Sequence, residues 1–344
     1  MTSTARLSLL ERLEHGPVIC AEGYLFECER RGYLQAGAFV PEVVLEHPEV
    51  VTELHREFVH AGSDVVEAFT YYAHREKLKV LGKEHLLEEL NRRALELARE
   101  VADETGALFA GDLSNTNVFA PDDASRKTVR TMFEEQAGWA VEAGVDFIIG
   151  ETFSWAEEAL IALETIRGTG RPAVVTLAIH QEPATREGWS PQEACKRLED
   201  AGADVVGLNC IRGPETMLPL LRAVRSAVSC QVAALPVPYR THAEQPSMQS
   251  LRDPAREGRP FPTALDPFTC TRDEIADFGR EALELGVRYL GVCCGAGPHH
   301  IRSLAEAVGR TAPASRYSAD MSKHSFLGTD PALRPDYQAY ADRL

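Results

Sequence analysis

The sequence lacks long hydrophobic runs and carries fewer basic residues than acidic ones. Its 344 residues include 36 lysines and arginines against 52 aspartates and glutamates, a formal net charge of −16. This charge argues against nucleic acid or an anionic membrane surface as a partner. No stretch approaches the roughly 18 apolar residues of a membrane span. Because residues 1–16 are also too polar for a secretion signal, the cytoplasm is the expected compartment.

The sequence also lacks the patterns of a disulfide framework and of a dinucleotide-binding site. The eight cysteines are too scattered in a chain of this length to form a dense disulfide framework. No GxGxxG-type pattern follows any apolar run, so we expect no dinucleotide cofactor.

One pattern recurs along the chain: a helix-like stretch ends in a glycine, and a short apolar run soon follows. Such a glycine suits the left-handed position after a helix, and the run is typical of a strand buried on both faces. The pattern covers residues 60–70, 104–114, 142–152, 168–178, 200–210 and 284–294, and two more runs lie at 17–23 and 230–237. Eight alternations predict an α/β fold, a single (β/α)8 TIM-type barrel over residues 1–311. An open, doubly wound sheet is the structural alternative.

The segments around the strands carry their own signals. Three pairs have the spacing of a helix-capping box, namely Ser154 with Glu157, Ser190 with Glu193, and Thr271 with Glu274. The Pro-rich segment 238–269 predicts a long loop before the last strand, and loops of that length are more often functional than not. Residues 312–344 carry no strand pattern. We expect an irregular tail that packs on the barrel or on a partner subunit.

Three cysteines lie where two of the predicted strands end. Cys210 follows one strand, and the adjacent Cys293 and Cys294 follow the last strand between Gly291 and Gly295. The active site of such a barrel lies at this end of the strands, so the three thiols can converge. Three thiolates suit a tetrahedral Zn²⁺ with its fourth position open. The two glycines would let both adjacent cysteines turn inward.

Other interpretations of this segment stay open. A strained disulfide between Cys293 and Cys294 would make the protein a redox sensor. A barrel that only binds an onium solute is a third hypothesis. His299 and His300 resemble metal ligands, but we expect them to open the final helix after Pro298.

These motifs resemble those of the zinc-dependent homocysteine S-methyltransferase family. The resemblance rests on "GLNC" at 207–210 and "GVCCG" at 291–295, and it extends over most of the chain. The segments 29–73 and 281–308 look most like the betaine-using branch of the family.

The resemblance implies a specific chemistry. Cys210, Cys293 and Cys294 would hold Zn²⁺, and homocysteine sulfur would take the open position as a thiolate. The sulfur would accept a methyl group from an onium donor, giving methionine and the demethylated donor. The substrates are small molecules, and a homo-oligomer is possible.

The resemblance also implies residues for the two substrates. Glu151 matches a glutamate that holds the homocysteine amine, while Glu22, Gly23 and Asn209 stand at the ends of other predicted strands. A cationic donor calls for aromatic faces. The candidates for these faces are Phe39, Phe69, Tyr71 and Tyr72.

Departures from the family pattern fall mainly on the donor side. Ala21 replaces an aspartate near the amine, although Glu22 could take over from the next position. Phe39 replaces a tryptophan, and Thr152 replaces a tyrosine that helps to bind the donor. Glycine betaine is the first choice of donor, with dimethylsulfoniopropionate or S-methylmethionine as alternatives.

Overall fold

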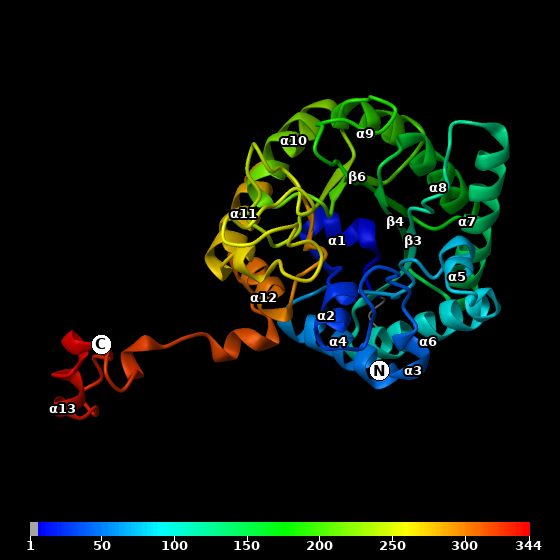
Figure 1. Cartoon of the computed structure of the whole chain (residues 1–344). Coiled ribbons are helices and arrows are strands. Elements are labelled where there is room, and N and C mark those ends of the chain that lie inside the picture. The colour runs from blue at the N-terminus through cyan, green and yellow to red at the C-terminus, as the bar shows by residue number, and fades with distance from the viewer. Residues whose placement is uncertain (1–5) are drawn as a thin grey trace.

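Eight parallel strands close into a barrel in chain order in the computed structural model, which describes residues 6–344 (Figure 1). β1 pairs with both β2 and β8, which closes the sheet. The predicted (β/α)8 barrel is confirmed, and the open-sheet alternative is wrong. The strands are β1 (Val18–Ala21), β2 (Val65–Glu67), β3 (Leu108–Ser114), β4 (Phe147–Phe153), β5 (Ala173–Leu177), β6 (Val205–Asn209), β7 (Gln231–Leu235) and β8 (Tyr289–Val292).

Helices surround the barrel and return the chain from each strand to the next. The glycines predicted to follow helices all have positive φ, namely Gly62, Gly106, Gly144, Gly170, Gly202 and Gly286. No helix within residues 6–344 is long and apolar enough to cross a membrane. The longer helices are α4 (Pro48–Ala61), α6 (Leu87–Thr105), α7 (Asp123–Ala143), α8 (Ala156–Gly168), α9 (Pro191–Asp200), α10 (Pro214–Ala227), α11 (Arg272–Glu284) and α12 (Pro298–Ala307).

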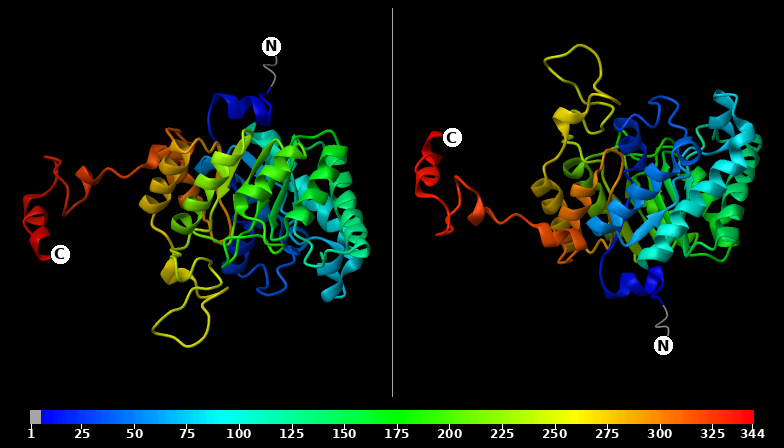
Figure 2. Two further views of the ribbon diagram at one scale, coloured as in Figure 1. Left: turned by 90° about the horizontal axis from the view of Figure 1, so that it is seen from above. Right: turned by 90° about the horizontal axis from the view of Figure 1, so that it is seen from below.

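The chain also forms short helices and 3-10 turns. Some precede β1 or lie between strands, and others come after the last barrel helix. Leu9 and Leu13 of α1 are buried where this helix covers one end of the barrel. Figure 2 shows the 238–269 loop projecting from the opposite end. The short elements are α1 (Leu9–His15), α2 (Tyr24–Arg30), α3 (Val43–Glu46), α5 (Arg75–Val80) and α13 (Pro335–Gln338), with 3-10 turns η1 (Glu84–Leu86), η2 (Asp266–Phe268), η3 (Pro313–Tyr317), η4 (Met321–Lys323) and η5 (Ala341–Arg343).

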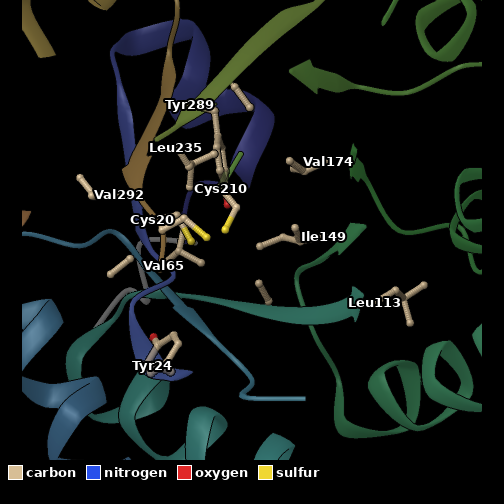
Figure 3. Packing of buried hydrophobic residues seen from close by; sticks show 14 of the residues in the cluster. Cys20, Tyr24, Val65, Leu113, Ile149, Val174, Cys210, Leu235, Tyr289 and Val292 are labelled. Carbon is tan, nitrogen blue, oxygen red and sulfur yellow. The ribbon is translucent and has the colours of Figure 1, made fainter. Parts of the chain in front are cut away.

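Apolar side chains fill the part of the barrel near the amino ends of the strands. The fully buried rings of Phe147 and Tyr289 meet edge to face with their centroids 6.4 Å apart. Figure 3 shows side chains from several strands gathered inside the barrel, including Cys20 and Cys210, whereas Leu113 points away from them. Because this packing fills the interior, chemistry is confined to the carboxyl ends of the strands.

Two of the three predicted helix caps are present. Thr271 forms a full capping box with Glu274, and the Ser190 hydroxyl accepts a hydrogen bond from the Glu193 backbone N–H. The prediction for Ser154 is wrong, because α8 begins at Ala156 without a side-chain cap. The Ser154 hydroxyl lies instead 2.9 Å from Nε2 of His180, at the mouth of the barrel.

The tail leaves the barrel after η3. η3 lies against α4 and α12, and the Ser318 hydroxyl hydrogen-bonds to Arg302 and Glu306 of α12. The chain from residue 319 onward projects away from the barrel (Figures 1 and 2). The tail was expected to pack on the barrel or on a partner subunit. For these residues, contact with a partner subunit stays a prediction.

Candidate functional site

The three predicted cysteines converge at the carboxyl ends of β6 and β8. The sulfur atoms of Cys210, Cys293 and Cys294 all lie within 4.8 Å of one another. Bonds of about 2.3 Å from each sulfur to a tetrahedral zinc would place the sulfurs about 3.8 Å apart. Cys210 and Cys293 are buried, and Cys294 is partly exposed toward the mouth. The donor set and its spacing therefore fit a metal ion bound by three thiolates.

The thiols also influence one another's ionisation. Hydrogen bonds from Cys293 and Cys294 hold the pKa of Cys210 well below its ordinary value. Burial raises the pKa of Cys293, and the hydrogen bond to Cys210 raises the pKa of Cys294. The three thiols therefore lie close enough to hydrogen-bond to one another, as a shared metal ion also requires.

The local backbone turns the thiols toward each other. Cys210 has a φ of 56°, an uncommon left-handed conformation for a residue with a side chain. Gly295, directly after the cysteine pair, has a φ of 95°. Gly291 stays within the regular strand β8, where a Cβ would lie 2.1 Å from the carbonyl oxygen of Cys20. The turn depends on Gly295 as predicted, whereas Gly291 is needed for close packing instead.

Asn209 connects the cysteines to two buried carboxylates. Its side-chain amide donates to Oε2 of Glu151 at 2.6 Å and to Oε2 of Glu22 at 3.2 Å. Its carbonyl oxygen accepts from the backbone N–H of Thr152 and from the hydroxyl of Thr176, each at 2.9 Å. The sequence placed Asn209 at the site but did not show that it joins both carboxylates.

An inner cavity of about 20 Å³ lies beside the thiols and is strongly acidic. Burial raises the pKa of Glu22 to about 8, and burial also raises the pKa values of Glu67, Asp112 and Glu151. No lysine, arginine or histidine is among the described residues that line this cavity. A cationic group would therefore be favoured here.

A larger outer cavity of about 680 Å³ opens on the other side of the thiols. The rings of Tyr71 and Tyr72 lie with centroids 4.3 Å apart. Phe39 stacks on Phe26 at 5.9 Å, and Phe261 of the long loop packs against Phe26 at 6.5 Å. The loop that was expected to be functional thus contributes to the wall of this cavity.

The predicted residues divide between the two cavities. Phe39, Tyr71, Tyr72 and Thr152 line the outer cavity. Phe69 does not, although it was expected there. It is buried, stacks on Tyr24 at 5.7 Å and lines the inner cavity.

Gly23 lines neither cavity. A Cβ on this residue would lie 2.2 Å from the carbonyl oxygen of Ala296, so it permits close packing beside the cysteine pair. His299 and His300 lie in the first turn of α12 as predicted, and His300 accepts a hydrogen bond from the backbone N–H of Gly297.

Sequence reasoning missed Glu67 as a residue of the site, and it placed Asp112 at a strand end without giving it a role. Both stand in runs that were assigned to strands buried on both faces. A carboxylate in such a run is costly unless it has a counter-charge, and this was the available signal.

Fold and site together define a TIM-barrel protein with a buried three-cysteine centre between an acidic and an aromatic cavity. The chain matches the homocysteine S-methyltransferase family over residues 24–308. It belongs to that family, and it is accordingly a methyltransferase.

Curated relatives include two kinds of enzyme. The chain is 37% identical to betaine–homocysteine S-methyltransferase 1 of Rattus norvegicus, over 96% of this chain and 83% of the rat protein. It is 36% identical to S-methylmethionine–homocysteine S-methyltransferase of Pongo abelii, over 96% of this chain and 90% of that protein.

Among solved structures, the chain resembles the metallated form of the homocysteine methyltransferase MmuM from Escherichia coli. The TM-score is 0.66 at 18% identity, covering 85% of this chain and 97% of that one. This similarity confirms the fold.

Proposed function

We propose that the protein is a zinc-dependent, cytoplasmic enzyme that transfers a methyl group from glycine betaine to homocysteine, giving methionine and the demethylated donor. One observation supports this most strongly. The three thiols lie where the acidic inner cavity meets the aromatic outer cavity, and Cys294 lines both. A sulfur atom held there would have an amine-binding site on one side and an onium-binding site on the other.

The three cysteines would hold the metal. When bound, Zn²⁺ would lower the pKa of the homocysteine thiol and so supply a thiolate at neutral pH. The position of Cys294 between the two cavities leaves the outer side of the centre open to a substrate. A two-cysteine redox pair needs no third thiol, so the convergence of Cys210 favours the metal.

Glu151 and Glu22 would bind the homocysteine amine. The Asn209 amide holds one oxygen of each carboxylate, which fixes both side chains toward the inner cavity. A substrate ammonium between them would stabilise two charges that are otherwise costly to bury.

The outer cavity would bind the methyl donor. The rings of Tyr71, Tyr72 and Phe39 offer faces to a cationic ammonium or sulfonium group. The ammonium of Lys77 already lies 4.1 Å from the centre of one face of Tyr72, so the donor would meet the opposite face.

The chemical step is a single displacement. The homocysteine sulfur forms a bond to the methyl carbon, and the bond from that carbon to the onium atom breaks with its electron pair returning to the donor. Opposite charges on thiolate and donor disappear together, so a cavity with little water favours the transition state.

A methionine-forming assay with three donors tests this proposal. Purified enzyme with homocysteine should form methionine with glycine betaine. Dimethylsulfoniopropionate and S-methylmethionine are tested in parallel, because Thr152 alters the donor side. Replacing Tyr72 with leucine should raise KM for the donor and leave KM for homocysteine unchanged. Absence of methionine with all three donors would contradict the proposal.

A further inference from the structure

The outer cavity has aromatic faces for the onium group of a donor but one permanent positive charge in its described lining. Glycine betaine, dimethylsulfoniopropionate and S-methylmethionine each carry a carboxylate as well as an onium atom. Arg186 is the only lysine or arginine among the described residues that line this cavity. Burial lowers the pKa of His180, so its ring is uncharged at neutral pH. The carboxylate of a donor therefore has one cationic partner in the described wall of the cavity.

The guanidinium of Arg186 is free to bind an anion. It forms no side-chain hydrogen bond or ion pair among the described residues. The buried carboxylate of Glu158 lies near enough to interact with this charge, but its Oε1 already accepts two hydrogen bonds from Thr116, at 2.6 and 2.8 Å. Glu182 is the only carboxylate in the described lining of the cavity, and it forms no ion pair with Arg186.

The side chain of Arg186 lies over an aromatic ring. Its guanidinium carbon lies 4.9 Å from the centre of the Trp155 ring, which follows β4. A guanidinium that uses its face in this way keeps the N–H groups at its edge available. Two of them can hold both oxygens of one carboxylate, which a lysine ammonium cannot match.

Hydrogen bonds also fix the backbone of the loop that carries Arg186, between β5 and α9. The backbone N–H of Arg186 donates to the carbonyl oxygen of Ser154 at 2.8 Å, which ties the loop to the end of β4. The neighbouring Thr185 is buried, and its backbone N–H donates to the carbonyl oxygen of Trp189 at 2.9 Å. Because the backbone is already held, an anion bound here would cost little further ordering of the loop.

We propose that Arg186 binds the carboxylate of the methyl donor and so selects onium compounds that carry one. This inference rests on the proposed function, which assigns the outer cavity to the donor. The aromatic rings would hold the onium group, and Arg186 would hold the other end of the molecule. A compound with the same onium group but no carboxylate would then bind more weakly.

Glycine betaine and choline are matched probes, because both have a trimethylammonium group and only glycine betaine has a carboxylate. Full-length protein loaded with zinc is titrated with each by calorimetry, in the presence of homoserine, whose hydroxyl replaces the reactive thiol. A hydrogen bond to a charged group corresponds to a factor of about ten or more in affinity. We expect the wild type to prefer glycine betaine at least about tenfold, and Arg186→Gln to bind the two equally.

Arg197→Gln is the matched control. The guanidinium carbon of Arg197 lies 4.1 Å from the centre of the Trp189 ring, but this arginine does not line the outer cavity. The control should therefore keep the preference of the wild type. Arg186 is exposed, so its replacement should leave the Tm unchanged, which shows that the variant is folded.

Two outcomes would overturn the proposal. One is a wild type that does not bind glycine betaine more tightly than choline, and the other is a preference that persists in Arg186→Gln. Failure of the proposed function gives a different result. A protein that prefers glycine betaine through Arg186 but forms no methionine would bind the donor without transferring its methyl group.

Discussion

At the scale of single residues, Asn209 connects several polar side chains of the site. It is fully buried, and its amide contacts Glu151, Glu22 and the hydroxyl of Thr152. A hydrogen bond to a charged group contributes about 1.5–3 kcal/mol. One side chain therefore positions both carboxylates that we assign to the homocysteine amine.

Replacing Asn209 with alanine should impair homocysteine binding. Loss of one such hydrogen bond corresponds to a rise in KM for homocysteine of at least about tenfold. KM for the donor should change little. Steady-state kinetics on both substrates measure this. Asn115→Ala, which removes the partner of the Tyr71 hydroxyl in the outer cavity, should leave KM for homocysteine unchanged. An unchanged KM for homocysteine would remove Asn209 from the site.

Gly295 makes a second test possible. A Cβ there would lie 2.2 Å from the hydroxyl oxygen of Tyr239, and the backbone has positive φ. Gly309 also has positive φ but has open space around it, so Gly309→Ala measures backbone strain alone, about 1 kcal/mol. Gly295→Ala should lower the free energy of unfolding more and reduce metal content. Equal effects of the two variants would show that the contact with Tyr239 is unimportant.

Sequence could identify the thiols but not the full acidic cavity. The three cysteines stand at strand ends, where parallel strands bring their residues together. Glu67 was hidden within an apolar run and Asp112 was given no role, because a strand pattern does not show which face a polar residue occupies. Phe69 was assigned to the wrong cavity for the same reason.

At the scale of elements, α4 carries a buried histidine that makes the fold sensitive to acid. Both ring nitrogens of His55 lack a hydrogen-bond partner among the described residues, and burial lowers its pKa to about 3. The unfolded chain binds a proton below about pH 6.5 while the folded chain does not. The stability is therefore complete above pH 6.5 and falls as the pH drops toward 3.

Replacing His55 with phenylalanine should reduce this acid sensitivity. At pH 5 the difference in pKa corresponds to about 2 kcal/mol of lost stability. Urea unfolding at pH 7 and pH 5 should show a smaller loss for the variant than for the wild type. His60→Gln, an exposed position on the same helix, is the control. Equal losses in variant and wild type would show that His55 is protonated without unfolding.

The sequence predicted the presence of the strands better than the residues at which helices begin. All eight strands were found, because a glycine-ended helix followed by an apolar run repeats along the chain. The cap at Ser154 was wrong because its hydroxyl pairs with His180, which follows the neighbouring strand β5. Sequence spacing alone cannot weigh a local cap against a long-range partner.

At the scale of the whole molecule, the tail is the part least connected to the barrel. Leu327 and Leu344 are 56% and 71% exposed, and Figure 2 shows this segment standing apart from the barrel. Exposed apolar residues on a projecting segment favour contact with another subunit.

Deleting residues 319–344 should therefore leave the barrel intact and change its association. We expect the Tm of the truncated protein to stay close to the Tm of the full-length monomer. Light scattering should show self-association for the full chain and not for the truncated one. Identical masses per particle for the two proteins would remove the tail from any subunit contact.

The zinc content of the full-length protein, purified under reducing conditions, tests the central claim most directly. The account predicts one zinc per chain, lost in Cys293→Ala and kept in Cys195→Ala, whose thiol is buried away from the site and faces the Gly207 carbonyl oxygen. Wild-type protein that contains no zinc and takes up none would contradict the account.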